Sequence, residues 1–270
     1  MSRADFQMEV KEKKRFEFGE NWKKFLFYLD DQRVKEAENS IKEMLEVESL
    51  EGKTFLDMGS GSGLFSLAAR NLGARVTSVD FDESSVWCTD ELKRRFFASD
   101  DRWQVIHGSV LDKGFLSTLG RFDFVYSWGV LHHTGQMWQA LANIVSLVRE
   151  EDGCLFIALY NRQTIASAYW KMVKRTYTRF LFMRPVWIIV HVLYPTVPSL
   201  VLRVLKKKKM PRGMTVWYDL LDWLGGYPFE VSTPTEIFNF YKEKGFSLSK
   251  LKTVGGKLGC NEFVFRRNFM

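Results

Sequence analysis

Three glycines at alternate positions follow a short apolar run and an acid, in the segment Asp57-Met58-Gly59-Ser60-Gly61-Ser62-Gly63. Because glycine has no side chain, the backbone N–H groups of such a loop can approach a ligand closely. A helix that begins after the loop directs its positive end at the same point. A second acid, Asp80, ends the next predicted strand, residues 75–80. A carboxylate there can accept hydrogen bonds from both hydroxyls of a ribose, so the spacing indicates a ligand that contains a nucleoside.

Two of the four histidines are adjacent, in Val130-Leu131-His132-His133-Thr134, directly after a later apolar run. An imidazole has a pKa near neutrality and can remove a proton from a hydroxyl. Successive side chains seldom face the same way, so we expect only one of His132 and His133 to meet a substrate. Either of them could instead cap the next helix or hold the loop, and the sequence does not choose between the two.

Alternating strands and helices must position these residues. Strands are predicted at 54–58, 75–80, 103–107, 122–127 and 154–160. Helices are predicted at 33–49, 64–72, 83–97, 137–148 and 234–244, and a closing hairpin at 247–253 and 261–267. This alternation implies an α/β fold with a parallel sheet and helices on both faces. Ligands of such sheets lie at the carboxyl ends of the strands, where the glycine loop, Asp80 and the histidines are expected to meet.

The composition is that of a folded chain with a sizeable core. The 270 residues are 46% hydrophobic and 26% charged, which excludes intrinsic disorder. The three cysteines are widely spaced and include no Cys-x-x-Cys pair. A disulfide scaffold is therefore not expected, no metal site is predicted, and a reducing, cytoplasmic location is favoured. The mostly polar segment 1–15 predicts no secretory signal.

The positive charge is concentrated in residues 161–214, which hold twelve Lys and Arg residues and no Asp or Glu. The rest of the chain has 27 basic and 32 acidic residues. In a helix over 165–180, one face is predicted to hold Tyr169, Met172, Val173, Tyr177 and Phe180, and the other to hold Lys171, Lys174, Arg175 and Thr178. The uncharged run 185–202 contains Pro195 and Pro198, which leave pieces shorter than the ~20 residues of a spanning helix.

Three uses of the basic block are compatible with its pattern. A cationic amphipathic helix followed by short apolar pieces suits an insertion that lies on an anionic membrane surface, which would make the protein peripheral. The block could also be a hydrophobic lid over an active site, with its lysines solvated. RNA is the least favoured partner, because no RNA-binding module accompanies the block and phosphate tracking does not need so many aliphatic residues.

Two classes of ligand for the glycine loop are disfavoured because the loop lacks their sequence motifs. A Walker loop ends in Gly-Lys-Ser/Thr, whereas Gly63 is followed by Leu64, and the dinucleotide fingerprint has its third glycine where Leu64 stands. The remaining pattern, Asp-x-Gly-x-Gly-x-Gly with an acid after the second strand, resembles the class I S-adenosylmethionine-dependent methyltransferases over residues 54–160. The resemblance implies a Rossmann-like fold, with a mostly parallel seven-stranded sheet and a helical insertion, and S-adenosyl-L-methionine as cofactor.

The resemblance also implies which residues contact that cofactor. The methionine end would be held by Asp57, Gly59, Gly61 and Gly63, the ribose by Asp80, and the adenine by Phe81. Ser109 stands where family members usually have an acid near the adenine amino group, with Val110 beside it, and Ser127 and Trp128 match positions whose backbone meets the methionine. The segment 16–22 resembles an entry segment of bacterial quinone-biosynthesis-like methyltransferases and is expected to form a lid that brings Trp22 to the cofactor.

Residues outside the glycine loop are predicted to form the acceptor side. Asp219 and Asp222 lie three positions apart in an aromatic stretch, and so on one side of a helix. They suggest a wall of the acceptor pocket with Asp222 as a second candidate base, although Asp219 could equally be an exposed helical acid. The other residues predicted to bind the acceptor are Tyr160, Asn161, Arg212 and Trp217.

The expected reaction is in-line transfer of a methyl group to a hydroxyl of a small or lipid-linked acceptor, such as a quinol, a sugar or another secondary metabolite. The alternatives are an RNA-modifying methyltransferase and a membrane-associated module that binds S-adenosylmethionine without catalysis. We divide the chain into an N-terminal helical lid (1–52), the cofactor-binding core (53–160), the basic insertion (161–214), and a substrate-wall helix with the closing strands (215–270). The sequence leaves the oligomeric state open.

Overall fold

The structure is a computed structural model that describes residues 8–16, 18–19, 22, 25–26, 29–193, 221, 223–256 and 259–268. Its centre is a seven-stranded sheet with the order β3-β2-β1-β4-β5-β7-β6. The parallel strands are β1 (Thr54–Met58), β2 (Arg75–Asp80), β3 (Trp103–His107), β4 (Phe124–Trp128) and β5 (Cys154–Tyr160). β7 (Cys260–Arg267) is antiparallel to β5 and to β6 (Phe246–Lys252). The predicted α/β fold with a mostly parallel sheet is confirmed.

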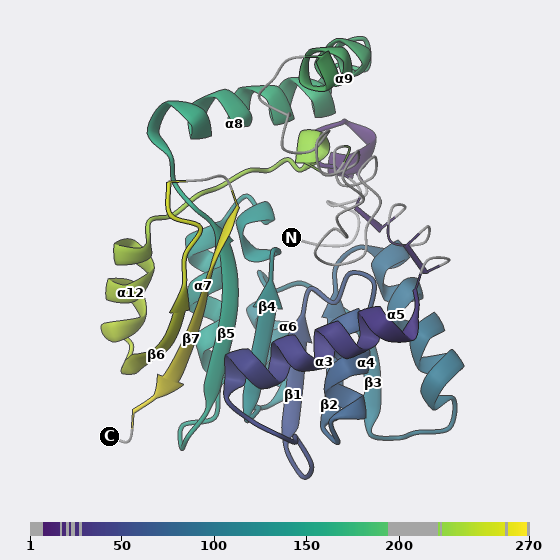
Figure 1. The fold of residues 1–270 in the computed structure, drawn as a ribbon, viewed down its shortest axis with the longest axis vertical. Coiled ribbons are helices and arrows are strands. Elements are labelled where there is room, and N and C mark those ends of the chain that lie inside the picture. Colours follow the sequence, from purple (N-terminus) through teal and green to yellow (C-terminus); the bar gives the residue numbers. More distant parts are fainter. Residues whose placement is uncertain are drawn as a thin grey trace.

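Helices cover both faces of the sheet (Figure 1). One face carries α3 (Asp31–Leu45), α4 (Leu64–Asn71) and α5 (Glu83–Phe97), and the other carries α6 (Lys113–Leu119), α7 (Met137–Ile144) and α12 (Pro234–Lys242). Successive strand residues supply the two cores in turn, since Phe55 packs with the first set of helices and Leu56 with the second. The central strands β1, β4 and β5 are therefore buried on both sides, which explains why their sequences are mostly apolar.

Local signals set the helix ends. The carboxylate of Asp82 accepts a hydrogen bond from Ser84 N and so caps α5, and Asp112 caps α6 in the same way. α12 begins with a capping box between Thr233 and Glu236. α6 was not among the predicted helices because its seven residues are too few to show a helical period. The helix predicted at 137–148 ends at Ile144, and a 3-10 turn follows it.

α8 (Thr164–Arg179) and α9 (Met183–Leu193) form a helical pair at the carboxyl ends of the strands (Figure 1). The predicted faces of α8 are wrong in part: Lys174 and Thr178 are buried together with Val173 and Tyr177, whereas Tyr169 and Met172 are exposed. Lys174 can be buried because its ammonium donates a hydrogen bond to the Trp223 carbonyl and lies 4.3 Å from the centre of the Trp223 ring. Within the described ranges, no helix is long and apolar enough to cross a membrane.

Gly63 is needed where the loop after β1 turns into α4. Its φ is +82°, and a Cβ there would lie 2.8 Å from the Cα of Thr89 in α5. The absence of a side chain therefore lets α4 and α5 pack closely. This steric contact is separate from the conformational strain that any residue other than glycine has at positive φ.

Gly63→Ala is expected to lower the free energy of unfolding by roughly 1–3 kcal/mol more than Gly52→Ala does. Gly52 has a similar φ of +73° with no atom within 4 Å of the added Cβ, so it isolates the backbone strain. Urea denaturation of the two variants measures the difference. Equal losses would show that the contact with Thr89 is unimportant.

Candidate active site

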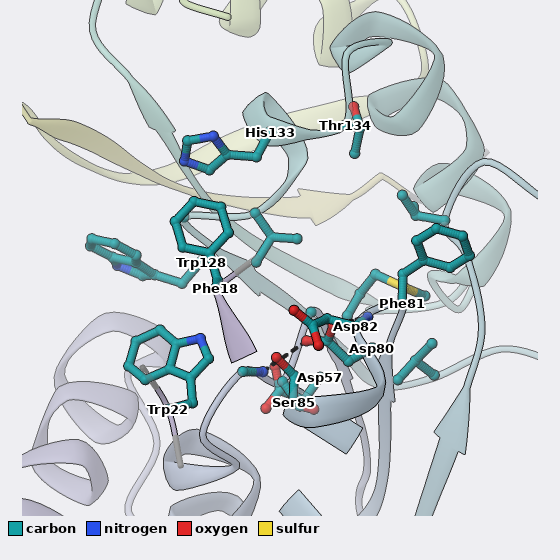
Figure 2. A pocket seen from close by; sticks show the side chains of 18 of the residues that line it. Phe18, Trp22, Asp57, Asp80, Phe81, Asp82, Ser85, Trp128, His133 and Thr134 are labelled. Carbon is teal, nitrogen blue, oxygen red and sulfur yellow. Dashed lines mark hydrogen bonds between the residues drawn. The ribbon is translucent and has the colours of Figure 1, made fainter. Parts of the chain in front are cut away.

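A cavity of about 420 Å³ opens at the carboxyl ends of β1, β2 and β4. This volume is in the usual range for a small-ligand site. Figure 2 shows its acids, Asp57, Asp80 and Asp82, between Phe81 on one side and an aromatic group on the other. That aromatic group consists of Phe18, Trp22, Trp128 and His133.

Where the glycine loop lines the cavity, its glycines contribute backbone atoms and no side chains. Gly59 and Gly61 line the cavity and have φ values of +92° and +55°. A Cβ on Gly59 would lie 2.4 Å from a methyl carbon of Val130, so only glycine fits between the loop and the segment after β4. Gly63, which the resemblance placed at the cofactor, is not among the lining residues and packs on α5 instead.

Asp57 is held by a chain of three hydrogen bonds that runs under the cavity. The Ser66 hydroxyl donates to Asp57 Oδ2 at 2.6 Å. The Ser78 hydroxyl donates to the Ser66 oxygen at 2.7 Å, and Trp103 Nε1 donates to the Ser78 oxygen at 2.8 Å. An indole nitrogen can only donate, so it fixes the direction of the whole chain toward the carboxylate. All four residues are buried. Burial raises the pKa of Asp57 to about 7, although the Ser66 bond opposes the shift.

Asp80 stands beside Asp57 at the end of β2. Its two carboxylate oxygens accept hydrogen bonds from the backbone N–H groups of Gly61 and Asp82, each at 2.9 Å. Burial raises the pKa of Asp80 to about 6, and these two backbone bonds oppose the shift. Both carboxylates therefore have pKa values raised toward neutrality, because burial disfavours their charged forms.

The side of the cavity expected to meet an adenine contains Phe81, Ser109 and Val110, all of which line it. The ring of Phe81 stacks on that of His107, with 5.7 Å between centroids. The Ser109 hydroxyl accepts a hydrogen bond from Leu111 N, which leaves its own hydrogen available to donate. A serine here thus offers a donor where family members usually have a carboxylate acceptor.

Ser127 and Trp128 at the end of β4 have different roles. Trp128 lines the cavity, and its Nε1 donates to Glu262 at 3.1 Å. The side chain of Ser127 is fully buried and donates to the Met58 carbonyl at 2.7 Å. Its contribution is to tie β4 to the start of the glycine loop.

Part of the N-terminal segment crosses the cavity. Phe16, Phe18 and Trp22 line it, and the indole of Trp22 lies 3.3 Å from where a Cβ on Gly61 would be. Gly19 N donates to Asp82 at 2.9 Å, which joins the segment to the start of α5. Trp22 therefore forms part of the cavity wall, and the lid stays a prediction.

Arg15 fixes this segment at the other end of the cavity. Its guanidinium donates to the carbonyls of His133 and Thr134 at 2.7 and 3.0 Å and forms an ion pair with Glu9. Sequence reasoning missed Arg15, and its position next to the aromatic lid segment was the signal that could have found it.

The two adjacent histidines face different ways. His133 lines the cavity, with its ring 4.9 Å from that of Phe18, whereas His132 is fully buried and is not among the lining residues. His133 Nδ1 lies 2.6 Å from the Pro228 carbonyl oxygen. A carbonyl can only accept, so the proton is on Nδ1 and Nε2 keeps its lone pair. Burial and, after it, the nearby charge of Lys174 together lower the pKa of His133 to about 3.

The predicted acceptor residues are only partly brought together. Tyr160 lines the cavity beside Trp223 and Tyr227, and its ring centroid is 5.4 Å from that of His133. Asn161 instead donates to the Gly255 carbonyl and accepts from Asn261, so it holds the β6–β7 connection. Outside the described residues lie Asp222, Arg212, Trp217 and Asp219.

Comparison with known proteins agrees with this geometry. Residues 56–155 match a family model described as a methyltransferase domain. The chain is 29% identical over 136 residues to the ubiquinone biosynthesis O-methyltransferase of Rhizobium leguminosarum bv. trifolii (strain WSM2304), covering 50% of this chain and 52% of that protein. It is 31% identical over 119 residues to the mitochondrial ubiquinone biosynthesis O-methyltransferase of Schizosaccharomyces pombe, covering 43% and 40%. The chain therefore matches about half the length of these relatives, or less.

The fold of this chain is also similar to that of a solved methyltransferase structure. Magnesium protoporphyrin IX methyltransferase from Synechocystis PCC 6803 with bound SAH superposes with a TM-score of 0.56 at 15% identity, covering 92% of this chain and 94% of that one. The domain match over residues 56–155, the curated relatives and this shared fold together support the class I S-adenosylmethionine-dependent methyltransferase family for this chain.

The residues of this methyltransferase fit S-adenosylmethionine, the cofactor of the family. The cavity contains carboxylates at the ends of β1 and β2, glycine backbone between them and Phe81 beyond Asp80. Carboxylates that are costly to ionise in a buried site are matched by a ligand that carries positive charge. Asp57 would face the amino acid end, Asp80 would accept from the ribose, and Phe81 would contact the adenine.

Cofactor affinity is expected to rise more than about tenfold between about pH 5.5 and 7.5, because the two carboxylates lose protons in this range. Both pKa values are raised in the folded protein, so low pH protonates the groups that a cationic ligand needs. Calorimetry at several pH values measures this dependence. Asp80→Asn should weaken binding and leave the shallower dependence due to Asp57. Affinity that does not change with pH would contradict the assignment of both acids.

Ser66→Ala is expected to weaken cofactor binding about tenfold near neutral pH, because the ionised form of Asp57 loses a charge-assisted hydrogen bond. The midpoint of the pH dependence should move upward, and the wild-type and variant affinities should converge at alkaline pH. Ser66→Thr keeps the hydroxyl and serves as the control. A loss that is constant across pH would indicate a packing defect instead.

Proposed function

We propose that this methyltransferase transfers a methyl group to the hydroxyl of a small or lipid-linked acceptor, with His133 as the general base. The observation that carries the proposal is the imidazole at the cavity wall, whose Nδ1–H is fixed on the Pro228 carbonyl and whose Nε2 is an acceptor. The named activity of the curated relatives, O-methylation in ubiquinone biosynthesis, supports the choice of a hydroxyl.

The walls around His133 favour an aromatic acceptor such as a quinol over a sugar. Phe18, Tyr160, Trp223 and Tyr227 line the same part of the cavity. Aromatic rings offer apolar faces for stacking and few hydrogen-bond partners. A sugar would leave several hydroxyls there without partners, at a cost for each of them.

Deprotonation of the acceptor is the step that the chain's own residues must supply. The pKa of His133 is about 3, so the ring is neutral at physiological pH and Nε2 can accept a proton. The same low pKa makes it a weak base, which favours an acidic hydroxyl such as that of a phenol over an aliphatic alcohol. Lys174, whose charge is felt at His133, also favours the anionic form of the acceptor.

Positioning and exclusion of water complete the mechanism. When bound, S-adenosylmethionine supplies a methyl group that is already activated for in-line displacement. Arg15 holds the backbone of His133 and Thr134, and the lid residues Phe18 and Trp22 close the side of the cavity opposite Phe81. A closed, oriented site lowers the barrier by removing solvent and fixing the approach.

His133→Gln is expected to lower kcat by about 10²–10⁴-fold while cofactor affinity stays unchanged, because only the proton acceptor is lost. Turnover is measured with labelled cofactor and a panel of phenols, hydroquinones and aliphatic alcohols, with the products identified by mass spectrometry. His191→Gln is the control, since His191 bonds Tyr169 and Trp187 and is not among the residues lining the cavity.

Full activity in His133→Gln would reject the assigned base. Methyl label in RNA and not in hydroxylated acceptors would favour the RNA-modifying alternative. Tight cofactor binding without transfer to any acceptor would favour the non-catalytic module.

A further inference from the structure

α8 presents its two sides to different surroundings. Trp170, Val173 and Tyr177 are buried in a cluster that includes Phe229, against which Tyr160 packs. The opposite side is exposed although it carries large apolar side chains, with Ile165 86% and Met172 47% exposed. An amphipathic helix that only covered a core would bury such residues. The exposed apolar side therefore has no explanation in the packing of α8 on the domain.

A row of cations runs beside these apolar residues. Lys171, Arg175 and Arg179 are four residues apart, so they lie in one line along the helix, and all three are exposed. They form no ion pair with any other described residue, and no Asp or Glu occurs between 161 and 193. The exposed side of α8 thus pairs an apolar row with a purely positive row.

The apolar surface continues into the turn and the second helix. Phe182, between α8 and α9, is 72% exposed, and Ile189 in α9 is 55% exposed. α9 is held on α8 by hydrogen bonds from Trp187 Nε1 to Thr176 and between His191 and Tyr169, at 2.9 and 3.1 Å. The pair stands at one extreme of the molecule, and no other described helix or strand lies beyond it in Figure 1.

We propose that the outward side of the α8–α9 pair docks on an anionic lipid bilayer, with Ile165, Met172 and Phe182 in the interface and Lys171, Arg175 and Arg179 on the lipid headgroups. A helix that lies in a membrane interface needs apolar residues flanked by cations. The apolar side chains enter the boundary between headgroups and acyl chains, and the cations pair with the negatively charged headgroups. Nucleic acid fits less well, because phosphate contacts make no use of an exposed apolar row.

The test is co-sedimentation of the whole chain with vesicles of phosphatidylcholine, alone or mixed with phosphatidylglycerol. The chain is expected to sediment with the mixed vesicles and not with the neutral ones. The triple variant Lys171→Glu, Arg175→Glu, Arg179→Glu should bind the mixed vesicles on the order of a hundredfold more weakly, given the contribution of each cation near an anionic surface. The triple variant Ile165→Ser, Met172→Ser, Phe182→Ser should lose the binding that persists at high salt.

The matched control reverses three exposed lysines elsewhere, Lys35→Glu, Lys113→Glu and Lys242→Glu, on α3, α6 and α12. It changes the net charge equally and should still bind. Each variant is first shown to be folded by its unchanged affinity for S-adenosylhomocysteine, which tests the cofactor site separately from docking. Absence of binding to mixed vesicles, equal binding to neutral vesicles, equal weakening in both charge variants, or RNA binding that mixed vesicles do not displace would each overturn the proposal.

Discussion

Two neighbouring carboxylates, the buried Asp57 and the partly buried Asp80, are the constraint around which the rest of the site is arranged. Each must lose water to occupy the ends of β1 and β2, and the charge of Asp80 further raises the pKa of Asp57. The fold compensates with oriented donors: the hydroxyl of Ser66 for Asp57, and the backbone N–H groups of Gly61 and Asp82 for Asp80. These donors lower both pKa values and so favour the ionised forms of the two carboxylates. A positively charged ligand would further stabilise the ionised carboxylates. Binding of such a ligand is therefore linked to the loss of protons from Asp57 and Asp80.

The N-terminal segment connects the two halves of the cavity. Gly19 bonds Asp82 beside the acids, while Arg15, four residues earlier, holds the carbonyls of His133 and Thr134. Phe18 lies between these anchors, with its ring against that of His133. A ligand that orders one part of this segment therefore also affects the wall around the proposed base. Such a connection favours binding of cofactor and acceptor in one closed arrangement that excludes water.

The sequence predicted best what depends on periodicity and on backbone chemistry. The alternation of strand-like and helix-like segments predicted the parallel strands. The Asp-x-Gly-x-Gly-x-Gly loop, with the acid after the second strand, predicted that Asp57, Gly59, Gly61 and Asp80 meet at one cavity, which they line. The sequence-based predictions failed where a residue distant in the sequence determines whether a side chain is buried or what it contacts. The pattern put Lys174 on the solvated face of α8, but the carbonyl and ring of Trp223, 49 residues away, allow its burial. Gly63 has the same type and spacing as the other loop glycines, yet only the approach of α5 shows that its role is packing. Likewise, the carbonyl of Pro228 singles out His133, and nothing in a His-His pair foretells it.

The orientation of α8 on the domain connects the proposed chemistry to the proposed docking. Because Lys174, Val173 and Tyr177 turn inward, the helix becomes part of the cluster behind Tyr160 at the acceptor end of the cavity. The same orientation of the helix leaves Ile165, Tyr169 and Met172 exposed to solvent, next to the cations. One helix thus lies between the acceptor end and the surface proposed to meet lipid. A lipid-linked phenol would need to move its polar ring only across the thickness of this helix, while its apolar tail stays in the bilayer. On these proposals, the sequence of α8 satisfies two requirements at once, a charged and aromatic inner face for the reaction and an apolar and basic outer face for the membrane.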